Sequence, residues 1–187
     1  MLVTISREFG AAINNELNGT DGFHAPKMLY VLTRLHARAC QIAEEMICLL
    51  SNGFADGAMA RWRTLHEIAA VSLLISEHGD ELAERYIAHE IVETRRAALQ
   101  YEQFRTRLGE EPLTPKELQK IEDVYSNTIE RFGQEFRNPR GWASKHLKKA
   151  NPTIANIHYD WITSLHTTDW RATISMRTRR VLSLSLV

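Results

Sequence analysis

The sequence predicts an all-α fold, a single-domain bundle of about six helices with antiparallel central hairpins. Apolar residues recur in alternating steps of three and four, which is the spacing of a packed helix. Breaks that contain Gly, Pro or Asn separate these segments. Outside the weakly alternating tail from Asp169, no useful period-2 run predicts a strand. The 187 residues are 44% hydrophobic and 25% charged, which is typical of a globular chain with a sizeable core.

The first two helices are expected at 2–18 and from Pro26 to about Leu50. Residues 18–22 form the break between them. The second helix ends at Gly53, and the short link that follows predicts an antiparallel hairpin with the third helix.

The third helix is expected to begin at a cap, Asp56, and to end near Gly79. Asp80 then caps a fourth helix, which runs to about Leu108. Residues 109–115 form a loop.

A capping box predicts the start of the fifth helix, because Thr114 precedes Pro115 and Glu117 follows three residues after Thr114. A short basic helix is expected at 142–150 and a final helix at about 153–166.

The third helix carries the candidate site. Arg61, Arg63, His66 and Glu67 stand at the start of a long apolar run. In a catalytic interpretation His66 transfers protons, Glu67 orients it and Arg63 or Arg61 binds an anion. In the alternative interpretation Arg63 and Glu67, spaced i,i+4, form an ordinary structural ion pair.

Two further polar residues interrupt apolar stripes on the flanking helices. They are His36 on the second helix and Glu90 on the fourth. Buried polar groups need partners, so both are expected to join one connected cluster with Arg63, His66 and Glu67.

No metal or cofactor site is expected, because no Glu-x-x-His pair occurs and the cysteines lack zinc-finger spacing. Cys40 and Cys48 lie ~12 Å apart on one expected helix, too far for a disulfide. Reduced thiols indicate the cytoplasm. No apolar block is long enough to span a membrane.

The formal net charge is zero, which excludes a strongly basic surface field. Any RNA contact would therefore depend on local cations. The candidates for phosphate contacts outside the third helix are Arg140, Lys145, Lys148 and Lys149.

Four blocks resemble a bacterial helical family known only as a domain of unknown function. They are FADGAMARWRTLHEIAAV, ERYIAHEIVETRRA, RGWASKH and HYDWITSLHTT. The resemblance covers about residues 25–168 and implies a helical fold, with His66, Glu67, Trp142 and His166 at matching positions. It suggests an N-terminal helix and linker at 1–24, a core at 25–168 and a C-terminal tail at 169–187, shorter than in relatives.

Arg61-x4-His66 and Arg140-x5-His146 also resemble the Arg-x4–6-His pattern of the HEPN superfamily, although roughly two such matches are expected by chance. That resemblance implies a metal-independent ribonuclease of a defence or stress system, with proton transfer by His66 and His166. The alternative is a non-enzymatic helical interaction domain. A homodimer is expected in either case, because tryptophans and the apolar end VLSLSLV crowd the C-terminal third.

Overall fold

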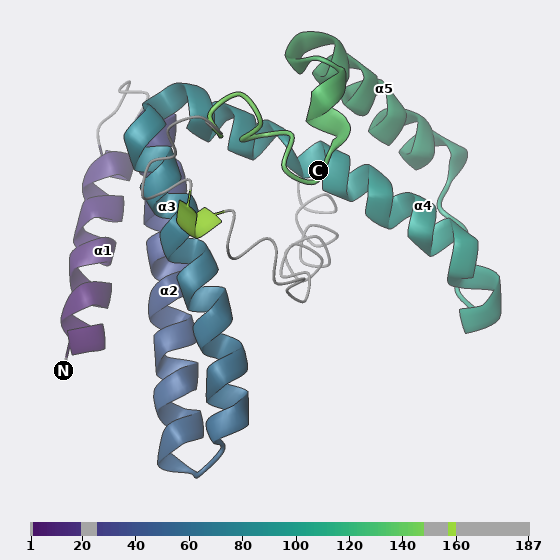
Figure 1. Ribbon diagram of the computed structural model, residues 1–187. Coiled ribbons are helices and arrows are strands. Elements are labelled where there is room, and N and C mark those ends of the chain that lie inside the picture. The colour runs from purple at the N-terminus through teal and green to yellow at the C-terminus, as the bar shows by residue number, and fades with distance from the viewer. Residues whose placement is uncertain (1, 20–25, 148–156, 160–187) are drawn as a thin grey trace. The chain divides into compact units, whose positions relative to one another are not determined.

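The computed structural model describes residues 2–19, 26–147 and 157–159 (Figure 1). Within these ranges it is entirely helix, turn and loop, which confirms the all-α prediction. The elements are α1 (Leu2–Gly19), α2 (Lys27–Ser51), α3 (Ala55–Ala88), α4 (Glu90–Leu108), α5 (Pro115–Phe132) and the 3-10 helix η1 (Gln134–Arg137). In the described residues, no helix is long and apolar enough to cross a membrane.

The chain divides into two compact units. The first holds α1, α2, α3 up to Glu84 and residues 157–159, and the second holds the end of α3 from Arg85, then α4, α5, η1 and the turns as far as His146.

Helices α2 and α3 form the central hairpin of the first unit, as predicted (Figure 1). Gly53 has φ 80°, a left-handed conformation that glycine adopts without steric cost, so the chain can reverse there. The buried side chains of this unit include Val31, Leu35 and Ile42 of α2 and Ile68, Leu74 and Ile75 of α3.

The start of α2 is capped by a residue from α3. Pro26 precedes the helix and supplies no side-chain cap. Instead, the backbone N–H of Met28 donates to Asp80 Oδ1 at 2.8 Å, and Lys27 forms an ion pair with Glu84 at 3.0 Å. Asp80 was expected to cap its own helix, so its observed role differs.

The predicted break at Gly79 occurs as a kink inside α3. Gly79 has φ 68° and ψ −148°, and helical hydrogen bonding continues on both sides of it. Only glycine adopts this backbone region readily, which explains the residue at this position. The helix expected from Asp80 follows this kink as the last part of α3, but it ends at Ala88 and does not run on to Leu108. A turn at His89 separates it from α4.

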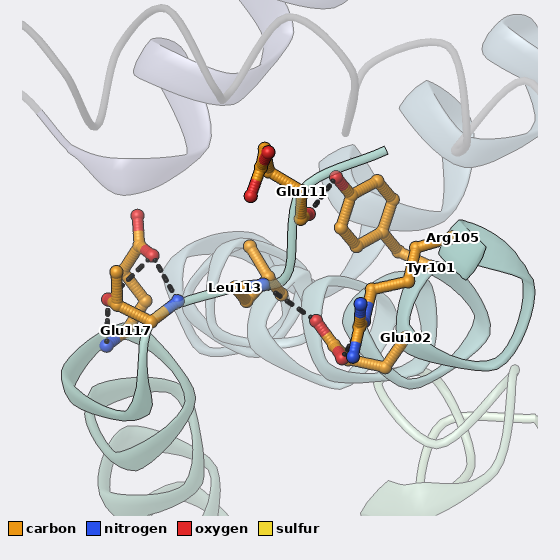
Figure 2. A network of polar contacts seen from close by, with 7 residues as sticks. Tyr101, Glu102, Arg105, Glu111, Leu113 and Glu117 are labelled. Carbon is orange, nitrogen blue, oxygen red and sulfur yellow. Dashed lines mark hydrogen bonds and ion pairs between the residues drawn. The ribbon is translucent and has the colours of Figure 1, made fainter. Parts of the chain in front are cut away.

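In the second unit α4 and α5 are joined by a loop that is bonded to both helices (Figure 2). Tyr101 donates to the carbonyl of Glu111 at 2.7 Å, and the N–H of Leu113 donates to Glu102 at 2.7 Å. The predicted capping box at Thr114 and Glu117 is present. The loop is thus fixed at both ends, and this sets the start of α5.

The residues after η1 form consecutive turns as far as His146. The predicted short helix at 142–150 is therefore wrong for its described part. The reason is that the turn is bonded through Gly141 and Trp142 to the end of α3, as described below. The predicted final helix is described only at 157–159, which are helical.

Candidate functional site

The candidate site in the first unit is a pair of imidazoles. His66 Nε2 on α3 lies 3.1 Å from His158 Nδ1, and one ring donates a hydrogen to the other. Such a bond needs one N–H and one lone pair, so the pair can carry at most one extra proton. Burial lowers the pKa of His66, and the nearby charge of His158 lowers it further. His66 is consequently neutral at neutral pH.

Trp62, one helical turn before His66, forms one side of this pair. Its ring meets the His66 ring edge-on, with centroids 5.2 Å apart, and 41% of its surface stays exposed. Arg63 is also exposed, and the described residues contain no ion-pair partner for it. The expected Arg63–Glu67 ion pair does not form. The site thus presents an aromatic ring and an uncompensated cation next to the two histidines.

The other residues of the third-helix cluster are placed differently. Arg61 pairs with Glu45 on α2 at 3.0 Å, so its charge is compensated within the chain. Glu67 is half-buried beside His66 in sequence. His166 lies outside the described residues. Among the described residues, His158, which was not predicted, contacts His66.

His36 on α2 is hydrogen-bonded to the backbone of α1. Its Nε2 donates to the carbonyl of Ser6 at 2.8 Å, while Ser6 Oγ lies at 3.3 Å and Cys40 Sγ at 3.6 Å. Because Nε2 carries the hydrogen, it cannot accept a proton from the Cys40 thiol. The close approach of Gly10, where a Cβ would lie 2.7 Å from the His36 ring, shows how tightly the helices pack there.

Glu90 is exposed in the first turn of α4 and belongs to the second unit. The neighbouring His89 is the buried polar residue, with 3% of its surface exposed. His89 Nε2 donates to the carbonyl of Asn138 at 2.9 Å, and its ring meets Phe136 edge-on. The sequence therefore predicted Glu90 as the buried polar residue, whereas the buried residue is its neighbour His89.

Arg85 is the second buried polar group of this unit and was not singled out from the sequence. It donates to the carbonyls of Trp142 and Gly141 at 2.8 and 2.9 Å. Its guanidinium also lies over the rings of Phe132 and Phe136. The i,i+4 spacing of Arg85 and His89 between apolar residues was a signal that could have revealed both. Arg85 and His89 donate to main-chain carbonyls of the 138–144 turn, so their role there is structural.

Of the candidate phosphate contacts, Arg140 is half-buried within this turn and Lys145 is exposed. Lys148 and Lys149 lie outside the described residues. Trp142, a residue of the family resemblance, is fully buried against Tyr86.

A hollow of about 400 Å³ lies in the second unit, between α4, α5 and η1. Its walls include Arg95, Glu122, Tyr125 and Arg137, and none of the residues proposed from the sequence lines it. Arg95 is engaged by Glu122 at 2.6 and 3.3 Å and stacks on Tyr125. Among the described residues, no group of three or more His, Cys, Asp or Glu side chains is placed to hold a metal ion.

A comparison with protein-family models matches residues 29–163 to a family described as "Family of unknown function (DUF5677)". The matched range is close to the 25–168 expected from the resemblance. Comparisons with curated proteins and with solved structures find no match.

Proposed function

The chain belongs to the DUF5677 family, whose function is unknown. From the structure we propose that this protein is a helical protein-interaction domain. The observation that supports this proposal is the end of the α2–α3 hairpin, which extends beyond α1 (Figure 1).

Large apolar side chains are concentrated at this end of the hairpin, which we call the hairpin tip. They are Ile47, Leu50, Phe54, Met59 and Trp62, with 54%, 57%, 62%, 60% and 41% of their surfaces exposed. Single exposed apolar residues are ordinary, but five within sixteen positions at one end of a hairpin favour a contact surface. Covering an apolar side chain stabilises a complex by roughly 25 cal/mol per Å² removed from water.

Polar side chains that are bonded within each unit support the same role. His36 fastens α1 to α2, Arg61 binds Glu45, and Arg85 and His89 hold the 138–144 turn. Each of these contacts fixes backbone or helix position. Such groups give a rigid scaffold on which a surface can be presented. Both cysteines are free, and we propose the cytoplasm as the location.

The test is site-specific photocrosslinking in cells. A photoreactive phenylalanine analogue replaces Phe54 at the hairpin tip, and in a matched control it replaces Leu108, which is also apolar and 71% exposed. We expect protein adducts at residue 54 that are lost when Met59→Ser is added. Equal adduct yields at both positions, or none at residue 54, would contradict the role of the tip.

The second candidate is HEPN-like, metal-independent RNA cleavage, and it is favoured by the hydrogen-bonded His66 and His158. A neutral histidine that is hydrogen-bonded to a second imidazole is suited to proton transfer as base and acid. Arg63 would contact phosphate, and the exposed ring of Trp62 would stack on a base.

This candidate is tested with purified protein and total RNA at pH 6–8, with and without EDTA. We expect His66→Ala and His158→Ala each to lower the cleavage rate by ~10²-fold or more, the scale of a lost general acid or base. His166→Ala tests the histidine of the family resemblance. Intact RNA with the wild-type protein, or cleavage that EDTA abolishes, rules out the mechanism.

A further inference from the structure

We infer that the partner of the hairpin tip is a second copy of this chain, bound antiparallel along the first turns of α3; this inference rests on the proposed interaction role. It begins from one face of that helix. At 100° per residue, Asp56, Met59, Ala60 and Arg63 lie within about 60° of a common direction. All four are exposed.

The two charged residues of this face have no ion-pair or hydrogen-bond partner among the described residues. They stand seven positions apart, which is almost two full turns and ~10 Å along the helix. An unpaired acid therefore marks one end of the face and an unpaired base the other. Met59, 60% exposed, and the small side chain of Ala60 lie between them.

A two-fold axis between residues 59 and 60 makes this face complementary to itself. Asp56 then meets Arg63 of the second copy, and the same pair forms again by symmetry. Met59 packs against its counterpart on the axis, and Ala60 lets the helix backbones approach. A parallel arrangement would instead oppose Asp56 to Asp56 and Arg63 to Arg63, which is repulsive.

The surroundings of the face fit a second copy. Ala58 and Ile68 are buried on another side of α3, so the face in these first turns is not needed for the packing of the hairpin. Trp62 borders the face and extends the apolar contact. A formal net charge of zero imposes no overall repulsion between copies.

The test is the mass of the purified full chain by sedimentation between 1 and 100 µM. We expect the wild type to dimerise, and Asp56→Arg and Arg63→Asp each to raise the dimer dissociation constant at least ~10-fold through like-charge contacts. The double variant, which exchanges the charges, should restore the dimer. Glu110→Arg, a reversal at an exposed loop residue, is the matched control and should change nothing.

A second readout fixes the geometry. In a Cys48→Ser background, which removes the exposed thiol, Ala60→Cys should form a disulfide-linked dimer, because residue 60 lies beside the axis. A monomeric wild type, or a dimer insensitive to both reversals, overturns this inference. The crosslinking experiment distinguishes this inference from the proposed function. If residue 54 forms adducts only with other proteins, the interaction role stands and the second copy is rejected.

Discussion

The guanidinium of Arg85 holds the main-chain carbonyl of Trp142, a residue 57 positions later, at 2.8 Å. Through this bond and the one to Gly141, a side chain of α3 fixes the 138–144 turn. Only arginine presents two parallel donors in a rigid fork, so the geometry explains why this residue type stands at a position that is 97% buried.

The first prediction follows from this fork. Arg85→Lys keeps the charge but leaves at least one buried carbonyl without a donor, and it should lower the free energy of unfolding by roughly 1–3 kcal/mol. Denaturant unfolding followed by tryptophan fluorescence measures the loss. Arg96→Lys, at an exposed position of α4, is the control and should change stability little. Equal stability of the two variants would show that the fork is dispensable.

The second prediction concerns Gly141. A Cβ at this position would lie 2.5 Å from the carbonyl oxygen of Phe136 and 2.6 Å from its carbonyl carbon and Cα, so the turn would have to move. Gly141→Ala should destabilise the protein by about 1–3 kcal/mol, the usual scale of overpacking.

The matched variant is Gly57→Ala within α3, where the nearest atom would be a Leu49 methyl at an ordinary 3.4 Å. It should stabilise the protein by about 0.5–1 kcal/mol, because alanine favours helix over glycine. Opposite signs for the two variants in thermal unfolding are the expected result.

The third prediction concerns the loop in Figure 2. The N–H of Leu113, and secondly the side chain of Arg105, lower the pKa of Glu102 below its ordinary value of 4.5. The folded state therefore favours the carboxylate. Its stabilising effect is present above pH 4.5 and is lost as the pH falls through the lowered pKa. The Leu113 amide should then exchange faster with solvent.

Hydrogen exchange at Leu113 between pH 6 and pH 2.5, corrected for intrinsic rates, measures this effect. Glu102→Gln should remove the pH dependence, whereas Glu110→Gln in the same loop should retain it. If Leu113 stays equally protected at both ends of the range, the carboxylate does not hold the loop.

The fourth prediction concerns the His66–His158 pair. Since burial lowers the pKa of His66, the unfolded chain binds a proton there more readily than the folded one. This contribution to stability is complete above pH 6.5, the ordinary pKa of histidine in an unfolded chain, and is lost as the pH falls through the lowered folded pKa. The free energy of unfolding should fall less steeply between pH 6.5 and pH 5 in His66→Gln than in the wild type. Parallel pH profiles would contradict the pKa shift.

Helix ends were the most predictable feature, because the residues that form them act locally. The capping box of Thr114 and the reversal at Gly53 both formed as expected. The buried faces of the helices were harder to predict from the sequence. The apolar stripe predicted for the fourth helix included Glu90, but the buried row there is Leu82, Arg85, His89 and Val92, so His89 is buried and Glu90 is exposed.

Partners distant in sequence could not be predicted. Periodicity tells which face of a helix is apolar, but not which other segment covers it. His66 meets His158, 92 residues away, and Met28 meets Asp80, 52 residues away. The expected network of His36, Arg63, His66, Glu67 and Glu90 depended on such distant pairings, and the contacts of His36 go to α1 instead.

The bond between Met28 and Asp80 also bears on how the protein is made. A nascent chain leaves the ribosome N-terminus first, so α2 is complete long before the residue that caps it is synthesised. An uncapped helix alone in water is only marginally stable. We therefore expect α2 to gain lasting structure only after translation has passed Asp80, so that the hairpin, and not either of its helices, is the unit that folds during synthesis.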